Sequence, residues 1–335
     1  MAEISVVMPV YIGEENTDAL DFLRVAMDSM QAQTFKDFEM IMVCEPGTSQ
    51  ASLDILEGYA KEDPRMKIIV NEKRLGISAS LNVGLMASSG KYIARMDADD
   101  ISGARRLEVQ KIYMDCSPDI GICGIKHKVI DAPNWWESHV TNPGIVESDL
   151  LFFLAAMHPT IMIRSELVEK GLLYDESLAG VEDYDLYIRG CKVTKITNIF
   201  EPSLLHYRIY KNSTYHINQE RDNNIRIMLM RNQFKDRLNL NFTDDDVNDI
   251  LSIYTSFNCN PKYYASKLKK LEAYLDKIIA ANNRLKEYDF DNLQTTMNHR
   301  WFRAAYSMKL NSGNKVPSSA MNVWRSSRYY DAWSD

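Results

Sequence analysis

Residues 90–102 read GKYIARMDADDIS, a short apolar run that leads directly into three acidic side chains. The run is expected to form a strand, with Asp97, Asp99 and Asp100 at its end. Three carboxylates within four residues repel one another unless a cation neutralises them, and oxygen ligands favour Mg²⁺ or Mn²⁺. Acids also favour the start of a helix, and a helix over 104–115 is expected next. The stretch by itself leaves a metal site and a helix cap open.

The residues around this stretch alternate between strand-like runs and helical spacing. Strands are expected over 4–10, 38–43, 67–70 and 91–96, and helices over 16–33, 53–59 and 77–88. Strand–helix alternation at this spacing indicates right-handed crossovers and a parallel sheet. Open sheets of this kind bind ligands at the carboxyl ends of their strands. Carboxylates recur in the segments that follow these strands, so we expect the ligand site at that edge.

The second half of the chain is less regular and then becomes helical. Strands are expected over 120–125, 160–164, 194–199 and 204–209, the last of which would finish the sheet, and helices over 223–238, 245–254 and 262–287. We therefore divide the chain into a catalytic domain over 1–215 and a helical C-terminal region over 216–335.

Glu182 and Asp183 stand at the expected start of a helix. A hydroxyl group is a weak nucleophile and needs a general base, a role that a carboxylate facing a cleft can fill. Acids in a first helical turn are also common as partners of the helix dipole. The pair is therefore a candidate catalytic site with a structural alternative.

The segment after the third expected strand contains Asn71, Arg74, Gly76 and Ser78 and leads into a helix. A helix amino terminus with a nearby arginine can receive a diphosphate. The spacing of a P-loop is absent, and no GxGxxG follows the first strand, so neither an NTPase nor a dinucleotide site is indicated. The alternative is an ordinary capped turn.

Two further loops carry candidate ligand contacts. Glu45 follows the second strand, where its carboxylate can accept a hydrogen bond from a nucleobase or can be an exposed loop acid. His206, Arg208 and Lys211 form a basic cluster that can neutralise a departing diphosphate, although a histidine beside an aromatic residue is commonly structural.

Composition and charge narrow the class of protein. The net charge is −7, but residues 262–335 carry 13 Lys and Arg against 7 Asp and Glu, so residues 1–261 are strongly acidic. This asymmetry argues against nucleic-acid binding by the front of the chain, while the basic tail suits an anionic surface. The five cysteines form no CxxC pair, which favours a reducing cytoplasm over a disulfide framework or zinc site. Neither a signal peptide nor a run long enough to cross a bilayer is indicated.

The order of the motifs resembles that of the family 2 glycosyltransferases. The motifs are SVVMPVY, VCEPGTS, NEKRLGISASLNVGL, GKYIARMDADDIS, MHPTIMIR and VEDYDLYIRG, and they extend over residues 3–210. The resemblance is closest to bacterial enzymes that build O-antigens, capsules and exopolysaccharides. It implies an α/β GT-A fold, which is a mixed sheet flanked by helices, here with a helical C-terminal extension. It also implies a UDP-sugar donor, a divalent metal (Mn²⁺ or Mg²⁺) and inversion at the anomeric carbon.

The resemblance assigns roles to individual residues. Asp97 and Asp99, which flank Ala98, match the family's DxD motif, with Asp99 as the direct metal ligand. Asp183 matches the catalytic base and Glu182 its acidic neighbour. Nucleotide contacts are implied for the loop after the first strand and for the carboxylate after the second, namely Pro9, Tyr11, Glu14 and Glu45.

The chain departs from the family pattern in places. Glu45, preceded by Cys44, stands where the family usually has Asp, which makes the preference for uridine less firm. Gly103 stands where Pro is common. No QxxRW motif occurs, so a processive synthase is not expected.

The tail over 262–335 mixes an apolar helical stripe with cations and, further on, aromatic residues. This mixture suits a bilayer interface, where a lipid-linked saccharide acceptor would be found, and predicts a peripheral contact with the inner face of the plasma membrane. The alternative is a helical region that packs on the protein itself or on a second copy. Two other functions stay open, a sugar nucleotidyltransferase and an inactive sugar-binding scaffold.

Overall fold

The computed structural model of the chain describes residues 2–130, 136–137, 140–201, 204–209, 219–255 and 261–311. Its contacts separate two compact units. The first is formed by Met1–Val146 with Leu154–Asp222, and the second by Glu147–Phe153 with Asn223–Asp335. Each unit is described in turn below.

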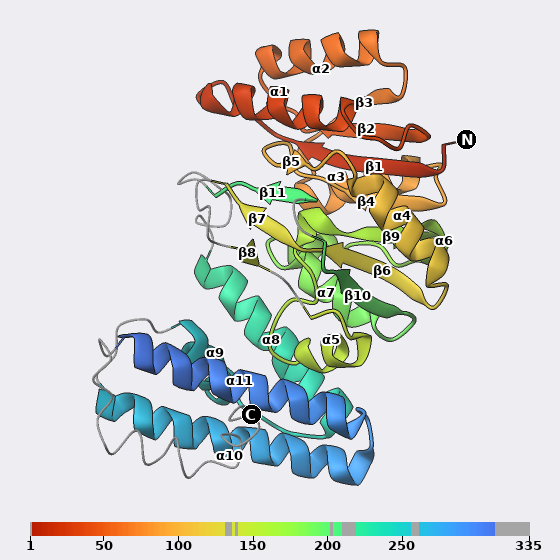
Figure 1. Cartoon of the computed structure of the whole chain (residues 1–335). Helices are drawn as coiled ribbons and strands as arrows, with labels where there is room; N and C mark the ends of the chain where they lie inside the picture. The colour runs from red at the N-terminus through yellow and green to blue at the C-terminus, as the bar shows by residue number, and fades with distance from the viewer. Residues whose placement is uncertain are drawn as a thin grey trace. The chain divides into compact units, whose positions relative to one another are not determined.

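The first unit is built on a seven-stranded mixed sheet (Figure 1). Its strands, in spatial order, are β10 Lys195–Ile199, β6 Ile120–Ile125, β9 Met162–Arg164, β4 Tyr92–Arg95, β1 Ile4–Val10, β2 Phe38–Cys44 and β3 Met66–Val70. β9 runs antiparallel to both of its neighbours, and the other pairs are parallel. The expected alternation of strands and helices in residues 1–100 is confirmed.

Helices cover both faces of the sheet. They are α1 Asp18–Gln31, α2 Gln50–Glu62, α3 Ile77–Ala87, α4 Arg106–Cys116, α6 Ser165–Glu169 and α7 Glu182–Gly190, with two short turns, η1 His158–Thr160 and η2 Glu176–Leu178. A further short helix, α5 Pro143–Asp149, begins in the first unit and ends in the second. Alternate residues of β1, among them Val6 and Met8, pack in one core with α1, α2 and α4. Val7 points the other way, toward Gly84 of α3, where an added Cβ would lie 2.3 Å from the valine Cγ1. Because both faces are covered, β1 reads as a continuous apolar run.

A second, four-stranded sheet stands beside the first in the same unit. Its order is β5 Ile101–Ser102, β11 Leu205–Tyr207, β7 His127–Val129 and β8 Trp136–Glu137. The expectation that residues 204–209 finish the main sheet is wrong, because β11 pairs antiparallel with β5 and parallel with β7 instead. β5 begins directly after Asp100, so this pairing brings residues beyond 200 to the end of β4.

The second unit consists of helices packed on one another. They are α8 Gln219–Leu238, α9 Asp244–Thr255, α10 Pro261–Leu285 and α11 Phe290–Asn311. The apolar stripe of α10 builds the core of this unit, with exposed fractions of 0–8% at Leu268, Leu271, Tyr274, Leu275, Ile278 and Ile279. The described part of the stripe therefore packs on the protein and does not face outward. The aromatic residues of the tail beyond 311 lie outside the described residues.

No helix within the described ranges has the length and apolarity that a bilayer crossing needs. The four cysteines that the structure covers, Cys44, Cys116, Cys123 and Cys191, are free thiols, while Cys259 lies outside the described residues.

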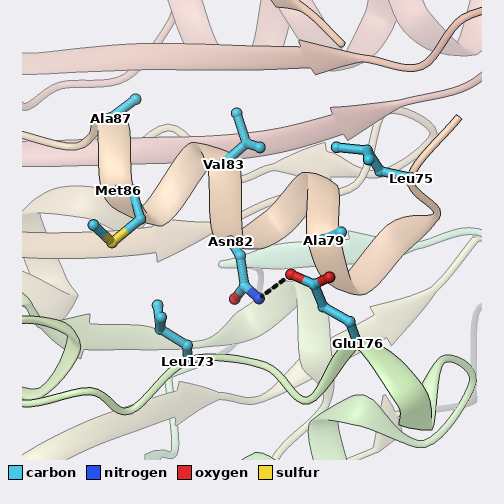
Figure 2. A pocket seen from close by; sticks show the side chains of 8 residues that line it. All are labelled: Leu75, Ala79, Asn82, Val83, Met86, Ala87, Leu173 and Glu176. Atoms are coloured by element: carbon cyan, nitrogen blue, oxygen red, sulfur yellow. Dashed lines mark hydrogen bonds between the residues drawn. The ribbon is translucent and has the colours of Figure 1, made fainter. Parts of the chain in front are cut away.

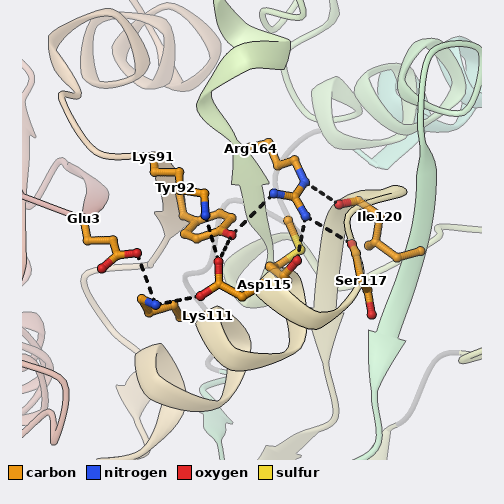
Figure 3. A network of polar contacts seen from close by, with 9 residues as sticks. Glu3, Lys91, Tyr92, Lys111, Asp115, Ser117, Ile120 and Arg164 are labelled. Carbon is orange, nitrogen blue, oxygen red and sulfur yellow. Dashed lines mark hydrogen bonds and ion pairs between the residues drawn. The ribbon is translucent and has the colours of Figure 1, made fainter.

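A network of polar contacts closes the end of β4 opposite to Asp97 (Figure 3). The Arg164 guanidinium donates to the carbonyls of Ile120, Met114 and Ser117, at 2.8, 2.6 and 3.1 Å. Beside it, Asp115 accepts hydrogen bonds from Lys111, Lys91 and the Tyr92 hydroxyl, and these bonds hold the pKa of Asp115 well below its usual range. The network ties β4, α4, β6 and β9 together.

Replacing Arg164 by methionine is expected to lower the free energy of unfolding by about 2–4 kcal/mol, because three carbonyls lose a charged donor. Urea unfolding followed by circular dichroism measures this change. Lys195→Met removes an exposed ion pair with Asp119, whose two side chains are 60% and 58% exposed, and is the control that should leave stability unchanged. Equal stability of the Arg164 variant and the control would contradict a structural role for the network.

Candidate active site

Three carboxylates gather at the end of β4. Oxygen atoms of Asp97, Asp99 and Asp100 lie within 4.8 Å of one another. Burial raises the pKa of Asp99 to about 6, and the charge of Asp97 adds to this effect. Burial and the two neighbouring carboxylates also raise the pKa of Asp100 well above its usual value. A cation would relieve the repulsion that these shifts record.

The cluster fits a divalent cation better than a helix cap. The Oδ2 atom of Asp100 is buried and has no hydrogen-bond partner among the described residues, whereas hard cations accept such oxygens as ligands. Helix α4 starts only at Arg106, and its N-cap residue Arg105 makes no side-chain capping bond. The helix-cap interpretation of the three aspartates is therefore wrong.

Arg208 lies against this cluster because β11 pairs with β5. Its backbone N–H donates to Asp100 Oδ1 and its Nε to the carbonyl of Asp99, both at 2.9 Å. Its guanidinium stacks on the Phe22 ring, 3.9 Å from the ring centroid. His206, two residues earlier, is half-buried, and burial together with the charge of Lys128 lowers its pKa. Lys211, the third member of the expected basic cluster, lies outside the described residues.

The acidic pair Glu182 and Asp183 opens α7. Glu182 is 5% exposed, and burial together with the charge of Asp183 raises its pKa to about 7. Its Oε2 accepts the Gly180 N–H at 2.5 Å. Asp183 is half-exposed, and its Oδ1 accepts the Tyr184 N–H at 2.7 Å. One acid of the pair is thus enclosed by protein and the other is accessible.

The two acidic motifs act on the same buried groups. Burial raises the pKa of the Tyr174 hydroxyl, Arg95 opposes this shift, and the charges of Glu182, Asp183 and Asp97 add to it. Arg95 pairs with Asp97, and its charge also acts on Glu182. Residues separated by more than eighty positions along the chain therefore surround one buried arginine–tyrosine pair. Arg95 and Tyr174 were not among the expected site residues.

The loops after β1, β2 and β3 also meet. The Arg74 guanidinium stacks on the Tyr11 ring, 4.5 Å from its centroid. A Cβ added at Gly47 would lie 3.6 Å from Cε2 of the same ring, and Gly47 has a φ of +91° that favours glycine. Tyr11 is 47% exposed. An accessible aromatic face beside a cation can stack on a flat heterocycle.

Glu45 is enclosed, so the interpretation of it as an exposed loop acid is wrong. It is 6% exposed, and its carboxylate accepts hydrogen bonds from Asn71 Nδ2 at 3.0 Å, from the Leu75 N–H at 2.8 Å and from the Ser80 hydroxyl. These bonds fix the end of β2 to the start of α3. Ser80 lies within the motif NEKRLGISASLNVGL, but no role was expected of it.

The other expected ligand residues stand on the same edge of the sheet. Pro9 lies in β1, and the exposed Glu14 accepts the Gln50 N–H at 3.3 Å. Gly76 is the N-cap residue of α3, with a φ of +85°. The Ser78 hydroxyl is buried and has no hydrogen-bond partner within the described part of the chain.

An open groove of about 640 Å³ runs along α3 (Figure 2). Its lining residues are mostly apolar: Leu75, Ala79, Asn82, Val83, Met86, Ala87, Leu173 and Glu176. None of the residues with an expected role lines it. The groove is therefore distinct from the site at which the aspartates gather.

Comparisons with known proteins bear on the family and the fold of the chain. A family model described as "Glycosyl transferase family 2" matches residues 5–170. An uncharacterized glycosyltransferase of Methanocaldococcus jannaschii is 34% identical over 216 residues, which cover 63% of this chain and 72% of that protein. The O-antigen biosynthesis glycosyltransferase WbnJ of Escherichia coli is 32% identical over 217 residues, which cover 63% of this chain and 81% of that protein.

A solved structure extends the likeness to the fold. The crystal structure of S. aureus TarS 1–349 in complex with UDP-GlcNAc matches with a TM-score of 0.59 and 14% identity, covering 93% of this chain and 92% of that one. At this identity the match concerns the fold alone. The expected GT-A fold, with its mixed sheet flanked by helices, is confirmed.

Mn²⁺ or Mg²⁺ is expected to raise the melting temperature of the wild-type protein, because a cation bound to the native aspartate cluster stabilises the folded state. Differential scanning fluorimetry over a metal titration measures the shift. The Asp97→Asn/Asp99→Asn double variant should lose it, while Asp54→Asn on the exposed face of α2 should keep it. A shift of equal size in all three proteins would place the cation elsewhere.

Proposed function

Because this chain belongs to glycosyl transferase family 2 and is a glycosyltransferase, we propose that it transfers a sugar from a UDP-sugar to a hydroxyl group of a growing surface glycan, with inversion at the anomeric carbon. The observation that carries the proposal is that a short chain of contacts links the two acidic motifs. Asp97 pairs with Arg95, the Arg95 N–H donates to the carbonyl of Ile161 directly after η1, and His158 of η1 lies 3.7 Å from Glu182, the neighbour of Asp183. Transfer requires that the donor diphosphate and the acceptor hydroxyl are held close together, so the residues that bind each of them must be neighbours.

The three loops around Tyr11 support a nucleotide at the carboxyl edge of the sheet. A uracil ring can stack on the exposed face of the Tyr11 ring. Arg74 would then either move away from the Tyr11 ring or cover the uracil from the side opposite to Tyr11. Asn71, Leu75 and Ser80 already occupy three of the roughly four acceptor positions of the buried Glu45 side chain, and the one that remains, on Oε2, suits a base that offers an N–H. The binding of UDP-GlcNAc by TarS, a protein of the same fold, also favours a UDP-linked donor.

The second group of residues suits the diphosphate. Asp97 and Asp99 would hold Mn²⁺ or Mg²⁺, and this cation, when bound, supplies positive charge to the leaving diphosphate. Arg208 lies at the same cluster and adds a permanent cation, with His206 nearby. The start of α3, with Gly76 and Ser78, offers backbone N–H groups to the phosphates.

The reaction requires one proton transfer at Asp183. The acceptor oxygen attacks C1 of the sugar from the face opposite to the diphosphate, and its proton passes to the Asp183 carboxylate. The C1–O bond to the acceptor forms while the C1–O bond to the phosphate breaks, and the electron pair leaves with UDP. A single displacement of this kind inverts the configuration at C1.

The relatives support a surface-glycan acceptor for this chain. WbnJ is described as an O-antigen biosynthesis enzyme, and an amylovoran biosynthesis glycosyltransferase of Erwinia amylovora is 27% identical over 184 residues. We extend these roles to a glycan or lipid-linked saccharide acceptor for this chain, used at the cytoplasmic face of a membrane. Because the chain belongs to this family, we favour a glycosyltransferase over the two alternatives, a sugar nucleotidyltransferase and an inactive scaffold.

A thermal-shift screen of UDP-, GDP-, CDP- and TDP-sugars with Mn²⁺ tests the donor class. UDP-sugars are expected to raise the melting temperature most, because only the bound donor stabilises the native state. Tyr11→Ala should lower the affinity for UDP roughly 5- to 100-fold, as expected for the loss of base stacking. A larger shift with another nucleotide would contradict the choice of uridine.

Asp183→Asn is expected to lower the rate of UDP release from the selected UDP-sugar about 10²- to 10⁴-fold, because the base is lost. Donor affinity, measured by calorimetry, should stay within about twofold of wild type, since Asp183 contacts the acceptor. Asp54→Asn is the matched control, with the same change in charge at an exposed position of α2. Turnover near that of wild type in Asp183→Asn would remove this residue from the mechanism.

A further inference from the structure

A cluster of buried polar side chains lies directly behind the accessible Asp183. Its members are Arg95, His158, Tyr174, Glu182 and Tyr187, with exposed fractions between 0% and 7%. They come from β4, η1, the segment before η2 and the first turns of α7. Buried polar groups are costly unless they satisfy one another. Within the described residues the Tyr187 hydroxyl and Arg95 Nε find no hydrogen-bond partner, whereas His158 contacts both Tyr174 and Glu182.

His158 joins two members of the cluster through its two ring nitrogens. Nε2 lies 2.8 Å from the Tyr174 hydroxyl, and Nδ1 lies 3.7 Å from Glu182 Oε1. The other oxygen of Glu182 accepts the Gly180 N–H. Each oxygen of this carboxylate therefore faces a different neighbour.

The protonation states of the three groups agree with this arrangement. Burial and the charge of Arg95 lower the pKa of His158 well below its usual value, so the imidazole is neutral. Burial raises the pKa of Tyr174, so its hydroxyl keeps its proton. When that hydroxyl donates to Nε2, the single ring proton of His158 lies on Nδ1 and faces Glu182.

Tyr174 is itself held in position from outside the cluster. Asn82 of α3 accepts the Tyr174 N–H at 2.9 Å and donates to the Tyr174 carbonyl at 3.0 Å. The same Asn82 side chain donates to Glu176 at 3.2 Å, the bond drawn in Figure 2. The backbone of Tyr174 is thus fixed by two hydrogen bonds to a helix, while its ring is 4% exposed and packs on the His158 ring at 5.3 Å between centroids.

We propose that His158, oriented by the Tyr174 hydroxyl, is a positioning residue that fixes the Glu182 carboxylate and with it the first turn of α7, which carries Asp183. The proposal rests on the proposed function, in which Asp183 is the base. His158 does not touch the reacting atoms in this scheme. It acts through Glu182, the residue that precedes the base.

The ionisation of Glu182 can be followed in the pH dependence of kcat, which a purely structural role of His158 would leave unchanged. Four neighbours bear on this carboxylate, namely Asp183 on the same helix, Arg95 from β4, His158 from η1 and the Gly180 N–H. Of these, the positive charge of Arg95 and the Gly180 N–H, which donates to the carboxylate, favour the ionised form, and the Nδ1–H of His158 faces the other oxygen at 3.7 Å. Loss of the N–H that faces Glu182 disfavours the ionised form, so Glu182 would then lose its proton only at higher pH.

The test compares four variants by steady-state UDP release from the UDP-sugar selected in the donor screen, with water as the acceptor. His158→Gln retains an amide near the position of Nε2 and loses the group that faces Glu182, whereas His158→Asn retains an amide near the position of Nδ1. Tyr174→Phe removes only the hydroxyl that orients the ring. Tyr59→Phe removes a comparable hydroxyl that donates to Asp28 on α1, outside the site, and is the matched control.

His158→Gln and Tyr174→Phe are expected to lower kcat roughly 10- to 100-fold, as a misplaced catalytic group does, with the donor KM within about twofold of wild type. The acid limb of their kcat–pH profiles should move to higher pH. His158→Asn should retain more activity than His158→Gln, and Tyr59→Phe should match wild type in every measurement.

The outcomes separate this proposal from the proposed function. An inactive wild-type protein that binds no nucleotide sugar overturns both. An active wild type in which Tyr174→Phe and His158→Gln behave like Tyr59→Phe overturns the positioning role alone. Lower kcat with an unmoved acid limb, or equal rates for the Gln and Asn variants, also overturns it, because general destabilisation would then explain the loss.

Discussion

The buried guanidinium of Arg95 is the charge on which the site depends. It pairs with Asp97, and its positive charge opposes the raised pKa values of Asp99, Asp100 and Glu182. Four carboxylates around an enclosed region would otherwise take up protons or force the chain apart. Since Arg95 is the last residue of β4, the strand that delivers the aspartates also delivers the charge that offsets them. The guanidinium therefore offsets part of the negative charge of the site before any substrate binds.

Much of the fold could be predicted from the sequence, because its signals are local. Strands such as β1 and β2 are seven-residue apolar runs, and the helices between them have clear spacing. The second sheet could not be predicted, since β5 and β8 have two residues each and β7 and β11 have three. No periodicity can be read in runs so short. The antiparallel direction of β9 likewise depends on its two neighbours in space.

The candidate site shows the same division. The aspartates and Glu182–Asp183 stand out because acids at the end of a strand or the start of a helix are visible in the sequence. Arg95 and Tyr174 are not visible in this way, because their importance comes from what surrounds them after folding. The burial of Glu45 and of the α10 stripe shows the opposite error. A residue that looks exposed or membrane-facing in the sequence becomes part of a core once its partners, here Ser80 and the neighbouring helices, are in place.

The pairing of β11 with β5 has a consequence for how the enzyme comes into being. The aspartates have been synthesised by residue 100, but the backbone N–H that binds Asp100 belongs to Arg208. A nascent or truncated polypeptide that stops before β11 contains the three aspartates but lacks the hydrogen bonds that Arg208 donates to Asp100 and Asp99. The shortest fragment that contains every group contacting the aspartate cluster described above must therefore extend through residue 208. The mutually repelling aspartates are therefore synthesised early, and the strand that contacts them, β11, is synthesised only about a hundred residues later.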